Sequence, residues 1–110
     1  MTDEKKPFGS QAMKTADSVG YSEDAVVSKQ LIKRGGGTIS LFAFDKGQSL
    51  SEHTAPFDAF VEVLDGEAEF VVGGKDVKVG TGEFIILPAN VPHSASAVQR
   101  FKMLLVMIKE

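Results

Sequence analysis

The sequence predicts an all-β fold, one barrel or sandwich, on three observations. From Ala25 onward, short runs rich in β-branched and aromatic residues alternate with turn residues at close intervals, which is typical of such folds. The pairs Asp65-Gly66 and Gly73-Gly74 separate apolar runs, and both pairs suit two-residue hairpin turns whose central residues have positive φ. Finally, a chain of 110 residues is long enough for one hydrophobic core and too short for two.

The polar residues 1–20 show no period and are expected to form a short N-terminal arm, with residues 21–110 as the barrel domain. The last run, Phe101 to Lys109, is apolar on both faces. This pattern predicts a strand buried between the core and a second surface. The strands are expected at Val26–Ile32, Thr38–Phe44, Phe60–Leu64, Glu67–Val72, Asp76–Val79, Phe84–Leu87, Ser94–Val98 and Lys102–Ile108.

Composition excludes several classes of function. The formal net charge is -3 and no basic stripe is present, so nucleic acid is not an expected partner. The absence of cysteine removes disulfides, thiol nucleophiles and thiolate metal sites. No apolar run is long enough to span a bilayer, and the N-terminus lacks the apolar core of a secretory signal. We therefore expect a cytoplasmic protein that does not insert into membranes.

Two segments carry a frame of glycine, proline and histidine. The first runs from Gly47 to Gly66 and contains His53, and the second runs from Gly82 through Pro88 to His93 and beyond. The two histidines are the only ones in the chain. The segments resemble the two motifs of the cupin superfamily, G-x5-H-x-H-x3-E-x6-G and G-x5-P-x-G-x2-H-x3-N. The resemblance covers about residues 25–110 and is to small single-domain bacterial members.

This resemblance implies an RmlC-like jelly-roll barrel, also called a double-stranded β-helix, with His53 and His93 inside it. Metal-bearing cupins would use three histidines and one glutamate. Here Ala55 and Ala59 stand at the second histidine and glutamate positions, and Ala97 replaces the final asparagine. Asn90 replaces a glycine, and asparagine tolerates the left-handed backbone conformation well.

Only His53 and His93 remain as candidate metal ligands, for Zn, Mn, Fe or Ni, and this set is short of the three protein ligands that catalytic sites need. The nearest carboxylates are Asp58 and Glu62. Strand alternation places them on the face of Phe60, away from the pocket. A bulge at Asp58 would reverse its direction.

Three interpretations of the histidine pair stay open. The pair is a residual metal site, a metal-free pair that hydrogen-bonds a small anionic or carbonyl ligand or moves a proton, or a structural remnant. An apolar pocket with two imidazoles suits an aromatic or short-chain metabolite. The residues expected to contact this ligand are His53, His93, Phe44, Gln48, Val61, Phe84 and Met103.

We favour a binding module for a small organic molecule. The alternative is a metal-dependent enzyme of the dioxygenase, isomerase or cyclase type, with no catalytic residue assigned, because this fold supports many activities. A homodimer is also expected, since a small barrel exposes sheet edges that a two-fold partner covers. Its contacts are expected at Val26, Leu31 and Phe60, with residues 17–32 added to the partner's sheet.

Overall fold

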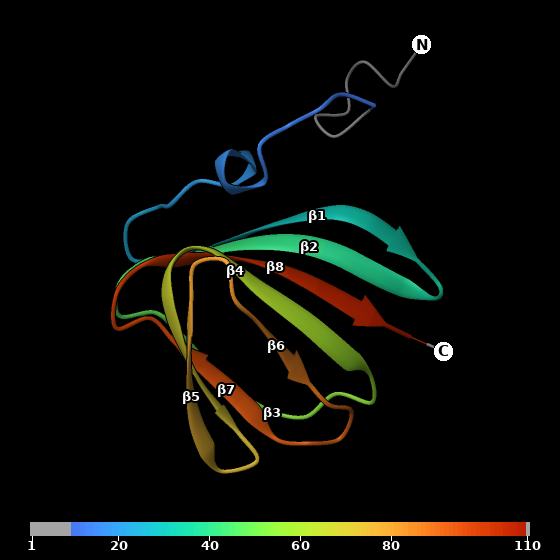
Figure 1. The fold of residues 1–110 in the computed structure, drawn as a ribbon, viewed down its shortest axis with the longest axis vertical. Coiled ribbons are helices and arrows are strands. Elements are labelled where there is room, and N and C mark those ends of the chain that lie inside the picture. The colour runs from blue at the N-terminus through green and yellow to red at the C-terminus, as the bar shows by residue number, and fades with distance from the viewer. Residues whose placement is uncertain (1–9, 110) are drawn as a thin grey trace.

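The structure is a computed structural model that describes residues 10–109 (Figure 1). A single-turn 3-10 helix, η2 (Thr15–Ser18), precedes the strands. No helix of the described residues is long and apolar enough to cross a membrane. The strands are β1 (Val26–Arg34), β2 (Gly37–Phe44), β3 (Ser49–His53), β4 (Asp58–Val72), β5 (Lys75–Gly80), β6 (Phe84–Leu87), β7 (His93–Ser96) and β8 (Phe101–Ile108).

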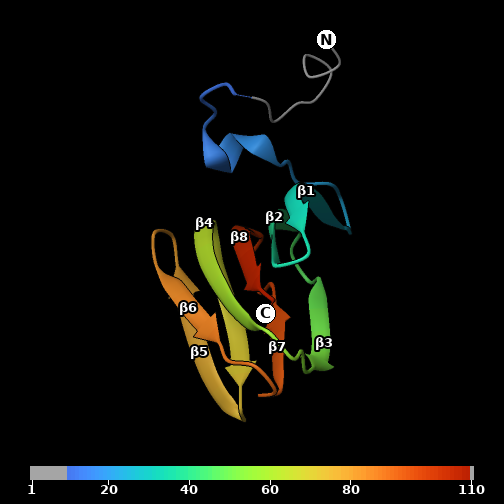
Figure 2. The ribbon, with the colours of Figure 1, turned by 90° about the vertical axis from the view of Figure 1, so that its right-hand side faces the viewer.

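Strand β4 belongs to both halves of the barrel. Its first half pairs with β8 and β6, in a sheet that continues through β2 to β1. Its second half pairs with β7 and β5, and β3 extends this second sheet beyond β7. Every pairing is antiparallel. The result is the curled sheet of a jelly-roll barrel, as the sequence predicts, and Figure 2 shows β3 and β5 on opposite sides of its lower part.

The predicted hairpin at Asp65-Gly66 is wrong, because β4 runs through both residues without turning. A register shift between Val63 and Asp65 marks a bulge, and only Gly66 of the pair has positive φ, at 79°. The strand bends here and passes from one sheet to the other. A Cβ on Gly66 would lie 2.2 Å from the backbone oxygen of Arg100, so the bend depends on glycine.

The second predicted hairpin is confirmed. Gly73 and Gly74 connect β4 to β5 in two residues, with φ values of 57° and 83°. One strand, β3, was not predicted, because all of its residues are exposed and Leu50 is its only apolar member. It lacks the alternation of apolar and polar residues that marks a half-buried strand.

Apolar side chains form two separate clusters. The main core fills the barrel, where the rings of Phe44 and Phe101 stack with centroids 4.5 Å apart. The second cluster is built on Val19, Leu41 and Ala43, with Leu104 of β8 packed against it. Met103 belongs to the main core, so β8 is buried on both faces, as its sequence predicts.

The N-terminal segment crosses above β1 and β2 (Figure 1) and is held there by Tyr21. The hydroxyl of Tyr21 donates a hydrogen bond to Asp65 Oδ2 at 2.6 Å, and the Arg100 guanidinium lies 4.3 Å from the centre of its ring. Lys102 Nζ donates to the backbone oxygen of Ala16. The first nine residues of the expected arm lie outside the described residues.

The homodimer and its three expected contacts stay predictions. Val26 is half-buried against the main core, and Leu31 is half-buried against the second cluster. Phe60 stacks on Phe84 at 5.0 Å, and Phe84 is 61% exposed. Of the three expected contact residues, Phe60 alone belongs to an exposed aromatic pair.

Replacing Gly66 with alanine is expected to destabilise the protein by ~3 kcal/mol, through the backbone clash and the strained φ. The measurement is the free energy of unfolding in urea. Gly47→Ala is the matched control, because Gly47 also has positive φ, at 88°, but has open space around it, so only ~1 kcal/mol of strain is expected. Equal losses in the two variants would contradict the role given to the bend.

Tyr21 provides a direct optical test of the clasp that it forms with Asp65. Burial raises the pKa of Tyr21 well above its ordinary value, and the hydrogen bond and charge of Asp65 add to this rise. Because the folded state holds the proton more tightly, the stability from this group is present below about pH 10 and is lost at higher pH, where the unfolded chain ionises first. The chain has one tyrosine and no tryptophan, so phenolate absorbance is expected to appear only with unfolding. A folded protein that ionises near pH 10, like the urea-unfolded chain, would contradict the clasp.

Candidate functional site

The two histidines are cross-strand neighbours. His53 is the last residue of β3 and His93 the first of β7, and their Cα atoms are paired in the ladder. Their ring centroids lie 4.4 Å apart, with the rings at 67° to each other. Forty positions of sequence therefore separate two imidazoles that are in edge-to-face contact.

A bulge in β3 gives His53 its direction. Leu50 pairs with Ala95 and His53 with His93, so three steps along β3 match two along β7. Residues three apart in a regular strand point to opposite faces. The extra residue of the bulge changes this, so Leu50 and His53 both face the same cavity. From His53 onward the alternation is regular, and every second residue to Val61 lines the cavity.

Backbone hydrogen bonds fix the loop that leads to His93. Asn90 has φ of 66°, the left-handed conformation that its place in the motif predicts, and its N–H donates to the backbone oxygen of Ala55 at 2.8 Å. The Asp58 carboxylate accepts the N–H of Ala89 at 2.8 Å. Asp58 therefore points away from the cavity, as strand alternation predicts, and ties the two histidine-bearing segments together.

Each imidazole is oriented by a backbone carbonyl. The Nδ1 of His53 lies 2.8 Å from the oxygen of Ser51, and the Nδ1 of His93 lies 3.1 Å from the oxygen of Val91. A carbonyl oxygen can only accept, so each Nδ1 carries the hydrogen. In the tautomer that this selects, Nε2 keeps its lone pair and is an acceptor or a metal ligand.

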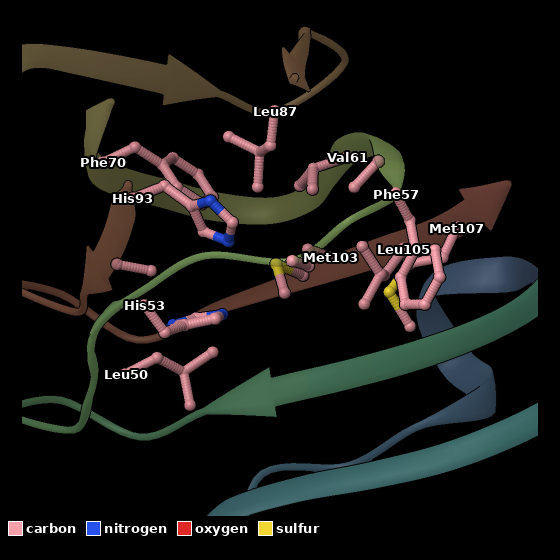
Figure 3. Close-up of a pocket in the computed structure, with 13 residues that line it drawn as sticks. Leu50, His53, Phe57, Val61, Phe70, Leu87, His93, Met103, Leu105 and Met107 are labelled. Atoms are coloured by element: carbon pink, nitrogen blue, oxygen red, sulfur yellow. The ribbon is translucent and has the colours of Figure 1, made fainter. Parts of the chain in front are cut away.

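Both rings line a cavity of about 80 Å³. Figure 3 draws the 13 lining residues, which are all apolar apart from the two histidines. Three of them, Met103, Leu105 and Met107, are alternate residues of β8. The cavity is thus an apolar chamber with two imidazoles on one wall.

Of the seven residues expected to contact a ligand, His53, His93, Val61 and Met103 line the cavity. The other three do not. Phe44 is fully buried against Phe101. Phe84 pairs with Glu62 on the outer face of β4. Gln48 sits in the turn before β3, where its backbone bonds to Asp45 and Ala97. With Gln48 outside the cavity, the two histidines are the only polar residues among those that line it in the described part of the chain.

Nine of the 13 lining residues were not among the expected ligand contacts. Leu50 was missed because β3 was not predicted, and Phe70 because the false hairpin broke the alternation along β4. Ala55 and Ala59 were noted only as lost ligands, although their parity with His53 also places them in the wall. Ala95 shares parity with His93. The other four are Phe57, Leu87, Leu105 and Met107.

The comparison with protein families decides which family this site belongs to. Residues 40–108 match the family model described as Cupin domain. The chain is a cupin. The matched span covers more than half of the sequence and includes both histidine-bearing strands. A comparison with functionally curated proteins gives no match.

Solved structures similar to this cupin come from several bacteria. A conserved protein of unknown function from Streptococcus pyogenes is 35% identical with a TM-score of 0.88, over 92% of this chain and 89% of that one. A cupin 2 conserved barrel domain protein from Leptotrichia buccalis is 45% identical with a TM-score of 0.83. The match covers 86% of this chain but 46% of the Leptotrichia chain. A cupin superfamily protein from Desulfitobacterium hafniense is 27% identical with a TM-score of 0.87, over 92% and 93%.

The residues of this cupin do not fit the divalent metal centre that the family resemblance implies. Ala55 and Ala59 occupy the cavity wall at the positions of the missing ligands, and methyl groups donate no electrons to a metal. Among residues 10–109, no group of three or more His, Asp or Glu is placed to hold an ion. Two imidazoles fall short of the three or more protein ligands that divalent centres use.

Restoring both ligands tests this account of the cavity. The double variant Ala55→His and Ala59→Glu is expected to retain about one Mn²⁺ per chain after desalting, whereas the unaltered protein retains none, because a carboxylate and a third imidazole complete the donor set. Elemental analysis measures the metal. The control, Ala55→Gln with Ala59→Gln, adds similar bulk without those ligands. A folded His/Glu variant that retains no more Mn²⁺ than the control would show that the wall positions do not converge on one point.

Proposed function

We propose that this cupin is a binding module for a small apolar molecule that carries hydrogen-bond donors. The observation behind the proposal is the engagement of both Nδ1 atoms by backbone carbonyls. That engagement leaves His53 Nε2 and His93 Nε2 as acceptors on one wall of an apolar cavity. A hydroxyl, amine or N–H group satisfies such acceptors, whereas a carbonyl oxygen does not.

The apolar wall supplies the rest of the recognition. Ala55 and Ala59 are smaller than the side chains that the family motif has there, so they leave room beside the imidazoles. Phe57, Leu105 and Met107 line the cavity away from the histidines, where Figure 3 shows them grouped together. Burial of an apolar body there contributes about 25 cal/mol per Å². An aromatic ring or short chain with one or two donor groups matches both parts of the cavity.

The proposal favours binding over catalysis. The metal-dependent alternative needs a divalent centre, and the donor set does not fit one. A histidine-mediated proton transfer needs a substrate held by other polar groups, but the remaining lining residues are apolar. The two imidazoles are therefore assigned to hold a ligand, not to transform it.

Catechol and 1,2-difluorobenzene form a probe pair of similar shape, and only catechol carries donors. In buffer with a chelator and without oxygen, catechol is expected to bind about tenfold more tightly, the effect of ~1.4 kcal/mol from hydrogen bonds to the imidazoles. Perturbation of the Met103 and Met107 methyl signals in NMR titrations gives the affinities. In His53→Ala and His93→Ala the preference is expected to shrink.

Glu52→Ala is the control variant, because Glu52 is exposed beside His53 and does not line the cavity. It should keep the full preference for catechol. Equal affinity for the two probes in the unaltered protein would overturn the proposal. So would a preference that survives both histidine substitutions.

A further inference from the structure

A row of five apolar side chains crosses the outer face of the sheet that β1, β2, β8, β4 and β6 form. Residues that pair directly across strands lie side by side on one face, and the ladders give the row the order Ile32 (β1), Ile39 (β2), Val106 (β8), Phe60 (β4) and Ile86 (β6). Its two ends are exposed, Ile32 by 49% and Ile86 by 47%. An exposed apolar stripe of this length is typical of a surface that another molecule covers.

The two ends of the row differ in shape. At the β6 end, the ring of Phe84 is 61% exposed and stacks on Phe60. At the β1 end lies a hollow of about 260 Å³ beneath the N-terminal segment, and its apolar walls are Met13, Leu31, Ile32 and Leu41. One end of the face therefore projects an aromatic ring, and the other end offers an apolar hollow.

The charges beside the row also differ between its two ends. On one side of the row, the ladder pairs that begin at Lys29 in β1 lead across β2 and β8 to Glu62 in β4. On the other side, the pairs that begin at Arg34 in β1 lead to Asp58 in β4. Both positive charges thus lie on β1, and both negative charges lie on β4, next to β6. The face is apolar in its middle and oppositely charged at its ends.

We propose that this face binds a second copy of the chain, about a two-fold axis that runs along the strands beside Val106. This rotation turns β1 of each copy toward β4 and β6 of the other. It brings the ring of Phe84 to the hollow of the other copy, and it brings the positive charges of one copy to the carboxylates of the other. One axis therefore matches both the shape and the charge of the face.

A two-fold axis that runs across the strands matches neither. It would set β1 against β1, with Lys29 facing Arg34, and β4 against β4, with Glu62 facing Asp58. Like charges that meet in an interface oppose association. Each hollow would then face the partner's β1, away from any exposed ring. The proposed dimer also differs from the one expected from the sequence, in which residues 17–32 extend the partner's sheet at its edge, because here two sheets pack face to face.

Light scattering after size exclusion tests the association and is expected to give twice the mass of one chain. Phe84→Glu should weaken dimerisation by about 100-fold or more, because it places a charge against the apolar hollow. The matched control is Val98→Glu, since Val98 is 57% exposed but lies between β7 and β8, outside the row. It should remain a dimer. A monomeric unaltered protein, or a Phe84→Glu variant that dimerises equally well, would overturn the proposal.

Thiol cross-linking tests the axis, and the chain has no cysteine of its own. Packed sheets lie about 10 Å apart, which is too far for a disulfide, so a short bismaleimide is the reagent. Val106→Cys is expected to link to its own copy, because it lies beside the axis. Ile32→Cys and Ile86→Cys should each stay unlinked alone and should link when the two variants are mixed.

The cross-linking pattern separates the possible arrangements. In the proposed dimer the two copies of Ile32 lie four strand spacings apart, about 19 Å, beyond the reach of the reagent. Self-linkage of Ile32→Cys would therefore place β1 against β1, and it would overturn the proposal, as would a mixture that fails to link. The row lies on the face opposite the cavity, because Phe60 alternates with Ala59 and Val61 of the cavity wall. The small-molecule function is thus tested independently of this interface.

Discussion

The structure depends on the bend of β4 at Gly66. One strand of 15 residues supplies the inner pairings of both sheets, and it can pass between them only where the backbone approaches Arg100 too closely for any side chain. Before the bend, β4 contributes Ala59 and Val61 to the cavity, and after it Phe70. The barrel closes around a chamber because a single strand contributes to two of its walls.

Much of this arrangement could be predicted from the residues alone. The glycines, Pro88 and the two histidines predicted the family and the approximate place of the site. The alternation of side chains along the strand correctly predicted that Asp58 points outward. The predictions that were wrong concern features that depend on contacts between residues far apart in the sequence. An Asp-Gly pair suits a hairpin as well as a bulge, and the carbonyl of Arg100, 34 positions away, decides between them. Similarly, Phe84 faces outward because it pairs with Glu62, an outer residue of β4, and no local pattern indicates this pairing.

The site itself combines rigid and permissive parts. Backbone hydrogen bonds from Asn90 and Ala89 hold the two histidine-bearing segments at a fixed separation, and the carbonyls of Ser51 and Val91 set the ring orientation. None of these contacts involves the side chain of Ala55 or Ala59. The two imidazoles are therefore oriented without help from the side chains at the two alanine positions of the wall.

That orientation limits which occupants suit the cavity. Each Nδ1 is engaged by a backbone carbonyl, so an Nε2 that keeps its lone pair accepts a hydrogen bond from a hydroxyl, amine or N–H group. The apolar wall near Phe57 offers contacts to the rest of such a molecule. The ligand that we propose joins a donor group to an apolar body, because that combination uses both parts of the cavity.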